Sequence, residues 1–253
     1  MCRLLGLYGR ADFWQDIVME FSKLSKFGKV PPVEGLESGH IDGWGMTMSN
    51  RKRTAMVPLI RQLGSAYDSS CYREAIYPMS VMPAVFMCHL RKASEQIPIT
   101  LSNVHPFYHN GWAFIHNGTI YRPESLPRHQ SIKLTSDSSD TELFFHFLLT
   151  KIMEAPAETE ISQIIIDAIR SLTVDYTALN SMLSNGKELY VIRSNKKWDA
   201  YYTIYYYPLA NGIIVCSEPI VSDRLNPDCW HSLDNDLILR IHGCPAKIDK
   251  FQI

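Results

Sequence analysis

The stretch Cys2-Arg3-Leu4-Leu5-Gly6-Leu7-Tyr8-Gly9 opens the chain directly after the initiator methionine. Its apolar residues predict a buried strand, which places Cys2 at the start of that strand. We expect Met1 to be removed, because cysteine is a small residue and small residues allow this cleavage. Removal leaves Cys2 with both a thiol and a free α-amino group.

An N-terminal cysteine carries its own general base. An ordinary α-amino group has a pKa of about 8, so a useful fraction of it is unprotonated near neutral pH. The amine can take the proton of the thiol, directly or through a water, and so produce the nucleophilic thiolate. Taken alone, Cys2 is better explained as a small apolar residue that opens a strand, because lone cysteines are mostly buried. The rest of the chain decides between these interpretations.

The composition is that of an ordinary globular protein. Of the 253 residues, 46% are hydrophobic and 20% are charged, and the formal net charge is −1. This length and balance predict a single domain over residues 1–253. There is no basic stripe for nucleic acid, no signal peptide, and no apolar run of the roughly 18 residues that a membrane span needs. We therefore expect neither nucleic acid nor a membrane as a partner.

The six cysteines are scattered and form no C-x-x-C pair. This spacing argues against a zinc site and against a disulfide framework. The apolar neighbours of Cys88 and Cys216 predict buried strands, so all cysteines except Cys2 are expected to be structural thiols. Free thiols persist in a reducing compartment, and we expect the protein to be cytoplasmic.

The periodicity of apolar residues predicts two blocks of strands with helices between them. Helices are expected over residues 11–26, within 65–77, from the entrance at 136–142, and over 161–172. Strands are expected over residues 39–48, in a hairpin over 51–65, and over 83–90, 111–115, 176–183, 189–194, 200–207 and 212–216. Asn185-Gly186 predicts a hairpin turn, and Gly43 and Gly45 indicate a bulge or the close approach of another backbone. The pattern predicts a layered domain of helices and sheets and leaves its exact arrangement open.

Two predicted strands carry polar groups at their C-terminal ends. Residues 83–90 lead into Arg91, and residues 111–115 lead into His116-Asn117-Gly118. Attack of a thiolate on an amide creates an oxyanion, which the side chain of Asn117 and the backbone N–H of Gly118 can stabilise. In isolation, a simple turn explains Asn117-Gly118 better.

Two charged residues fit the two ends of a free amino acid. Arg91 can hold a carboxylate through two parallel hydrogen bonds, or it can form a partly buried structural ion pair. Asp140 can bind an ammonium group, although in isolation helix capping or a favourable first-turn charge explains it better.

Together these groups resemble the class-II glutamine amidotransferases, which are N-terminal-nucleophile (Ntn) hydrolases. Short motifs carry the resemblance, and they stand in the family's order from residue 1 to about 145. They are Met1-Cys2, Asp42-Gly43-Trp44-Gly45, His89-Leu90-Arg91, Asn103-Val104-His105-Pro106, His116-Asn117-Gly118 and Ser139-Asp140-Thr141-Glu142. A weaker likeness, which includes Ser217-Glu218-Pro219, continues to about residue 220. No single motif is specific, but their order makes coincidence very improbable.

The resemblance implies a role for each residue of the reaction. Cys2 would be the nucleophile, with its own α-amino group as the base. Asn117 and Gly118 would form the oxyanion hole. Arg91 would bind the α-carboxylate of glutamine, and Asp140 would bind its α-ammonium group.

The resemblance also implies the fold and the surroundings of the pocket. The fold would be α+β, a four-layer αββα sandwich of two antiparallel sheets. His105 would organise the glutamine pocket, whereas Trp44, Gly45 and His116 would support it from behind or pack the core. The resemblance implies no metal and no organic cofactor.

Three functions remain open at this point. The short stretch after Pro219 leaves no room for an ammonia-consuming domain, so the chain resembles the stand-alone type. It can be a glutaminase that releases ammonia and glutamate, with a separate synthase or transferase subunit as the ammonia acceptor. It can instead hydrolyse a modified γ-glutamyl amide, such as one of a thiol metabolite, or it can be a catalytically silent binding or regulatory subunit.

Overall fold

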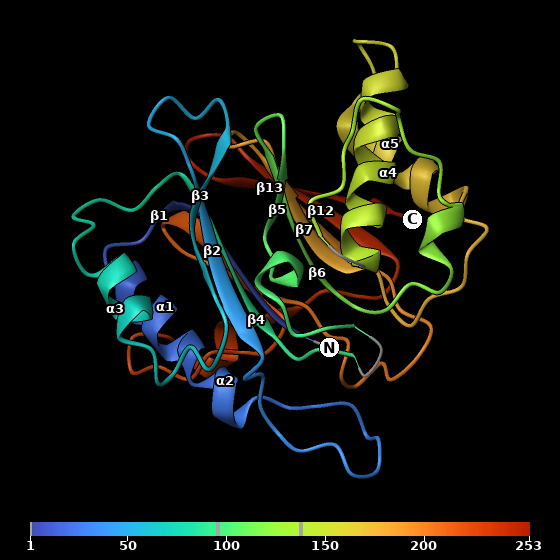
Figure 1. The fold of residues 1–253 in the computed structure, drawn as a ribbon. Helices are drawn as coiled ribbons and strands as arrows, with labels where there is room; N and C mark the ends of the chain where they lie inside the picture. Colours follow the sequence, from blue (N-terminus) through green and yellow to red (C-terminus); the bar gives the residue numbers. More distant parts are fainter. Residues whose placement is uncertain (1, 95–96, 137–138) are drawn as a thin grey trace.

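Two antiparallel β-sheets lie face to face in the computed structural model, and helices cover the outer face of each sheet (Figure 1). The structure describes residues 2–94, 97–136 and 139–253. Met1 lies outside these residues, so its removal stays a prediction. Residues 137–138 of the expected helix entrance also lie outside them.

Within the described residues, the first sheet has seven strands in the order β11-β9-β10-β1-β4-β2-β3. They are β1 (Cys2–Arg10), β2 (Gly43–Ser49), β3 (Met56–Gln62), β4 (Val85–Arg91), β9 (Tyr205–Pro208), β10 (Asn211–Cys216) and β11 (His231–Ser232). The opening strand β1 lies at the centre of this sheet, paired with β10 on one edge and with β4 on the other.

The described part of the chain forms a second sheet of six strands in the order β13-β12-β8-β7-β6-β5. They are β5 (Phe107–His109), β6 (Trp112–Asn117), β7 (Asn180–Ser184), β8 (Leu189–Arg193), β12 (Leu237–His242) and β13 (Lys247–Gln252). The pairs that the structure describes in both sheets are antiparallel. The hairpin predicted at Asn185-Gly186 is confirmed, because it joins β7 to β8.

Apolar clusters fill the spaces between four layers. Helices α1 (Trp14–Ser22), α2 (Leu24–Phe27) and α3 (Ser70–Ile76) lie on the outer face of the first sheet, and α4 (Asp140–Glu154) and α5 (Ile161–Arg170) lie on the second (Figure 1). One cluster, which includes Phe21, joins helices to the first sheet. Another, which includes Met182, lies between the two sheets, and a third, which includes Phe145, lies under α4 and α5. The expected four-layer αββα sandwich is confirmed.

Several element boundaries differ from the predicted ranges. The helix predicted over residues 11–26 is divided at Lys23 into α1 and α2. The strand predicted from residue 200 starts only at Tyr205, because the backbone N–H groups of Tyr201 and Tyr202 donate to the carbonyl of Trp198 and form a turn. The strand predicted from residue 176 starts only at Asn180. Strands β11 to β13 follow residue 216, where the sequence analysis assigned no strand.

Another backbone approaches β2 closely at Gly45, next to Trp44, as the sequence predicted. A Cβ atom on Gly45 would lie 2.2 Å from the carbonyl oxygen of His105, so only glycine allows this approach of two backbones. The pairing of β2 with β3 also shifts between Met46 and Thr47, which is the irregularity expected of a bulge.

All six cysteines lie in the described part of the chain as free thiols. Cys88 and Cys216 are buried in strands, as expected, whereas Cys229 and Cys244 are exposed. Burial raises the pKa of Cys88 to about 12, so this thiol stays protonated near neutral pH. None of the described helices has the length and apolar character that crossing a bilayer requires.

A buried ion pair fixes the start of β1. Arg3 is 1% exposed, and its Nη2 atom lies 2.9 Å from a carboxylate oxygen of Glu218 and 2.6 Å from the carbonyl oxygen of Lys29. Its guanidinium also stacks over the ring of Tyr201, at 4.6 Å from the ring centroid. These contacts tie the residue next to Cys2 to three segments that are distant in sequence.

We predict that Glu218→Gln lowers the free energy of unfolding by about 2–3 kcal/mol, because it leaves a buried guanidinium without its counter-ion. The matched control is Asp175→Asn, which removes a 3.0 Å ion pair with Lys196 between two exposed side chains. This control should leave stability nearly unchanged, because solvent screens such a pair. Denaturant unfolding measures both variants, and equal stability of the two would contradict the prediction.

Candidate active site

The first residue of β1 meets the ends of two other strands. In the first sheet Cys2 stands opposite Arg91, the last residue of β4. In the second sheet β6 ends at Asn117, and the backbone nitrogen of Cys2 donates to the Oδ1 atom of Asn117 at 2.7 Å. The contact joins the two sheets at one point, although the residues are 115 positions apart in the chain.

A small cavity of about 30 Å³ lies at this junction. Its lining includes most of the residues that the sequence pointed to, namely Cys2, Arg91, His105, His116, Gly118 and Asp140. The side chain of Cys2 is nearly buried, and its Sγ atom lies 3.9 Å from the carbonyl oxygen of Lys92. Trp44, Gly45 and Asn117 are not part of this lining, and Asn117 meets the site through the hydrogen bond from Cys2.

Asn117 keeps one buried side-chain donor unpaired close to Cys2. The Cys2 nitrogen donates, so the atom of Asn117 that faces it is the amide oxygen. The other amide atom, Nδ2, is buried and has no hydrogen-bond partner among the described residues. A buried donor without a partner is costly, and a bound oxyanion would satisfy it.

The position after Asn117 has no room for a side chain, and glycine, Gly118, occupies it. A Cβ atom at this position would lie 1.9 Å from the carbonyl oxygen of Ala178. The missing side chain therefore lets the backbone after β6 run close to residue 178 and beside the cavity.

Arg91 presents one free guanidinium nitrogen. Its Nη2 atom donates to the carbonyl oxygen of Pro98 at 3.1 Å, whereas Nη1 is buried without a partner among residues 2–94, 97–136 and 139–253. Asn103, which also lines the cavity, donates to the same carbonyl at 3.1 Å and keeps a buried, unpartnered Oδ1 atom in the described structure. The cavity thus holds an unused cationic donor and an unused neutral acceptor.

Asp140 is held rigidly at the first turn of α4. Its Oδ2 atom accepts from the backbone N–H of Ile120 at 2.8 Å, and its Oδ1 atom accepts from that of Thr141 at 2.9 Å. A carboxylate has about four acceptor sites, so each oxygen keeps capacity for a cation in the cavity. Ser139, which precedes the helix, makes no side-chain capping bond to the described residues.

Buried neutral histidines line the cavity or pack against its lining. The rings of His89 and His105 lie with their centroids 4.0 Å apart. Burial holds the pKa of each well below the ordinary histidine value, and the neighbouring positive charge of Arg91 adds to this effect. His105 is therefore neutral, and its Nδ1 atom accepts from the backbone N–H of His116 at 3.5 Å.

His116 connects three parts of the site. Its Nε2 atom lies 3.0 Å from the carbonyl oxygen of Ala178, an acceptor, so Nε2 carries the proton. Its Nδ1 atom then accepts from the hydroxyl of Thr141 at 3.0 Å. Burial lowers the pKa of His116, and the nearby charge of Asp140 opposes that shift.

Trp44 and Gly45 lie behind this site. Trp44 packs in the outer core, where its ring meets that of Tyr72 edge to face at 5.0 Å. Gly45 acts through the backbone of His105, whose carbonyl approaches it closely.

Two residues of the site, Asn103 and Tyr201, were not predicted from the sequence. Asn103 stood in a quoted motif without a role, and only the fold shows that its amide faces the cavity. Tyr201 was missed because its hydroxyl reaches the carbonyl oxygen of Cys2, at 3.4 Å, from 199 residues away. No local pattern marks such a contact. No three His, Cys, Asp or Glu side chains in the described residues are grouped as metal ligands would be.

The sequence and the fold of this chain are similar to those of known proteins. Residues 1–211 match the family model of the class-II glutamine amidotransferases. The chain belongs to this family. No curated protein sequence matches the chain.

Solved structures of this family share the fold. A glutamine aminotransferase class-II domain protein from Silicibacter pomeroyi matches with a TM-score of 0.63 and 18% identity, over 100% of both chains. A predicted glutamine amidotransferase from Pseudomonas aeruginosa matches with a TM-score of 0.55 and 17% identity, over 94% of this chain and 96% of the other.

A longer protein shares the same fold. Glutamine phosphoribosylpyrophosphate amidotransferase from B. subtilis matches with a TM-score of 0.61 and 15% identity. The match covers 98% of this chain but 49% of that protein, so this chain spans about half its length. At these identities the likeness establishes the Ntn-hydrolase fold.

The buried histidines predict a loss of stability in acid. His89 binds a proton in the unfolded chain below about pH 6.5, but burial keeps it neutral in the folded protein. The free energy of unfolding should therefore fall as the pH falls, by up to about 1.4 kcal/mol per pH unit for each such group. We expect His89→Gln to reduce this slope between pH 6.5 and 5, measured by denaturant unfolding. His231→Gln, at an exposed position, is the control; an equal slope in both variants would refute the linkage.

Proposed function

We propose that this protein is a glutaminase-type amidohydrolase that cleaves the γ-glutamyl amide bond through a thioester on Cys2, releasing ammonia and glutamate. The observation that carries the proposal is the 2.7 Å hydrogen bond from the Cys2 nitrogen to Asn117, whose other amide atom is a free donor. The same cavity holds a free nitrogen of Arg91 and the fixed carboxylate of Asp140. These groups complement an amide oxygen, an α-carboxylate and an α-ammonium group.

The proposed reaction begins with the free amine of Cys2. One of its hydrogens is donated to Asn117, which orients the nitrogen lone pair to take the thiol proton. The thiolate attacks the γ-carbonyl carbon, and the resulting oxyanion accepts hydrogen bonds from the Nδ2 atom of Asn117 and the N–H of Gly118. The amine returns its proton to the leaving nitrogen, the C–N bond breaks and ammonia departs. Water then hydrolyses the thioester and frees glutamate.

The other groups position the substrate. Binding of the α-carboxylate by Arg91 and of the α-ammonium group by Asp140 holds the amide beside the thiol, which lowers the entropic part of the barrier. His105 is neutral and shapes the pocket. Residues 1–253 would act as one such domain in the cytoplasm, and an ammonia-accepting synthase or transferase, where one is used, would be a separate subunit.

Replacement of the nucleophile tests the proposal. We expect Cys2→Ala to lower glutamine hydrolysis by at least about 10³-fold while the protein stays folded, because no other thiol lines the cavity. Cys244→Ala, at an exposed cysteine, is the matched control and should keep full activity. Residues added permanently before Cys2 should also abolish activity, because they convert the amine into an amide.

Intact mass gives an independent readout of the same site. The mature protein should lack Met1 and should gain one adduct with the glutamine analogue 6-diazo-5-oxo-norleucine, mapped to Cys2. Full glutaminase activity in Cys2→Ala would refute the proposed reaction. Loss of Met1 without activity or adduct would favour a silent subunit.

Truncated substrates test the two charged residues separately. 4-Aminobutanamide lacks the α-carboxylate of glutamine, and glutaramic acid lacks the α-ammonium group. We expect Arg91→Ala to raise KM for glutamine by about 10- to 100-fold, since a charged hydrogen bond contributes about 1.5–3 kcal/mol. The same variant should lose most of its preference for glutamine over 4-aminobutanamide.

Asp140→Asn should lose the preference for glutamine over glutaramic acid instead. The exposed Arg10→Ala is the control and should change neither preference. Preferences that survive in both variants would remove Arg91 and Asp140 from the substrate site.

A further inference from the structure

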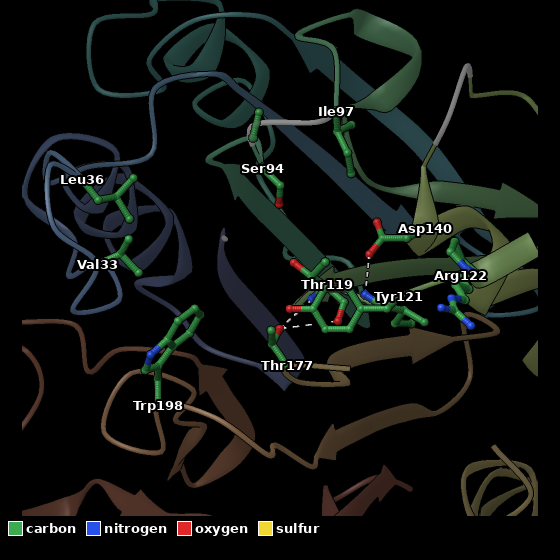
Figure 2. A pocket seen from close by; sticks show the side chains of 13 residues that line it. Val33, Leu36, Ser94, Ile97, Thr119, Tyr121, Arg122, Asp140, Thr177 and Trp198 are labelled. Atoms are coloured by element: carbon green, nitrogen blue, oxygen red, sulfur yellow. Dashed lines mark hydrogen bonds between the residues drawn. The ribbon is translucent and has the colours of Figure 1, made fainter. Parts of the chain in front are cut away.

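A larger cavity, of about 540 Å³, lies beside the reaction cavity (Figure 2). Ala93, Ser94, Ile97 and Asp140 line both cavities, so the two spaces adjoin through these four residues. Glutamine has ammonia as its leaving group, which needs no such volume. The larger cavity therefore calls for an explanation beyond glutamine hydrolysis.

The two ends of this cavity differ in chemistry. Figure 2 shows Asp140 and Arg122 at one end and the side chains of Val33, Leu36 and Trp198 at the other. The first end carries charges, and the second is an apolar wall formed by these three side chains.

Two series of contacts connect Cys2 with the segments that carry the apolar wall. The Cys2 thiol lies beside the carbonyl of Lys92, and the Nζ atom of Lys92 donates at 2.8 Å to the carbonyl of Glu37, next to Leu36. On the other side, Tyr201 contacts the carbonyl of Cys2, and its backbone N–H donates to the carbonyl of Trp198 at 2.8 Å. Each of the two segments that carry the wall is thus connected to Cys2 through one intervening residue, which is Lys92 for the first segment and Tyr201 for the second.

This arrangement gives the bound substrate a direction. The γ-glutamyl head would lie between Arg91 and Asp140, with its γ-carbonyl at Cys2. The group on the amide nitrogen would then extend toward the wall of Val33, Leu36 and Trp198.

The backbone of Trp198 supports a binding role for its ring. Its φ angle is 47°, a left-handed conformation that is rare and strained for a bulky residue. Two hydrogen bonds to its carbonyl and a stacked contact with Tyr202, at 6.0 Å between ring centroids, hold it there. Strained residues of this kind gather at ligand-binding positions.

We propose that the physiological substrate is a γ-glutamyl amide of an apolar, ring-bearing amine, whose ring packs against Trp198 and Leu36. This inference rests on the proposed γ-glutamyl hydrolysis and specifies its leaving group. The thiolate of Cys2 attacks the γ-carbonyl carbon, the C–N bond breaks, and the Cys2 amine gives its proton to the departing amine. Water then hydrolyses the thioester, so the products are glutamate and the free apolar amine.

Three substrates that share the γ-glutamyl head test the leaving-group site. They are L-glutamine, N-methyl-L-glutamine and N-benzyl-L-glutamine, of which the last two differ mainly in apolar size. Burial of a phenyl ring should raise kcat/KM of the mature protein for the benzyl amide at least about tenfold above that for the methyl amide.

Two wall variants then test where the ring binds. Trp198→Asn keeps a residue type that tolerates the left-handed backbone, and Leu36→Asn changes the wall from an independent segment. Each should lower the benzyl-to-methyl ratio of kcat/KM about tenfold, with circular dichroism as the check on folding. Trp230→Ala is the matched control, because this partly buried tryptophan packs against Tyr207 outside the cavity, and it should leave the ratio unchanged.

The outcomes separate this inference from the function on which it rests. Hydrolysis of glutamine without a preference for the benzyl amide would overturn the inference and leave the glutaminase standing. A preference that persists in both wall variants would also overturn it. Failure to cleave all three amides, together with no adduct at Cys2, would overturn the proposed function itself.

Discussion

The hydrogen bond from the backbone nitrogen of Cys2 to Asn117 is the contact on which the site depends. It joins the first strand of one sheet to the last residue of a strand in the other, so it forms only when the two sheets are stacked. Its geometry places the backbone nitrogen of Cys2 at the amide oxygen of Asn117, and the other amide atom of Asn117 stays buried without a partner among the described residues. The pairing of β1 on both edges, and the buried Arg3 next to Cys2, keep that point rigid.

Close backbone contacts also hold the rest of the pocket in place. Gly45 lets the carbonyl of His105 approach β2, and Gly118 lets the chain pass the carbonyl of Ala178. His116 then links that carbonyl to Thr141 at the start of α4, where Asp140 is anchored. Neutral histidines suit this role, because they can pack closely behind a cationic residue such as Arg91 without repelling it.

The unpartnered polar atoms are the most informative feature of the cavity. Within the described residues, a nitrogen of Arg91 and an oxygen of Asn103 are buried without partners on residues that line one cavity, and the amide nitrogen of Asn117 is a third such atom next to Cys2. A folded protein satisfies nearly all its buried polar atoms, so a cluster of unsatisfied ones indicates a ligand. The larger cavity beside them differs in polarity. Its wall of Val33, Leu36 and Trp198 is apolar and can bind a ligand through packing but not through side-chain hydrogen bonds of Val33 and Leu36.

The sequence by itself determined the family and the identity of the residues with chemistry to offer, and the αββα layering followed from the family resemblance alone. Cys2, Arg91, Asn117, Gly118 and Asp140 were recognisable because each stands in a short motif at a strand end or a helix start, and these motifs follow one another in the family's order. Element boundaries such as those near residues 176 and 200, and strands β12 and β13, were not recoverable. Their limits are set by long-range pairing and by the turn at Trp198.

Only the tertiary structure decided which of these groups meet. It placed Trp44 in the outer core, brought Asn103 and Tyr201 to the site, and opened the apolar cavity between loops far apart in sequence. The physical reason is that a hydrogen bond or a cavity wall depends on distances in space. Residues separated by more than a hundred positions leave no trace of such distances in the local sequence.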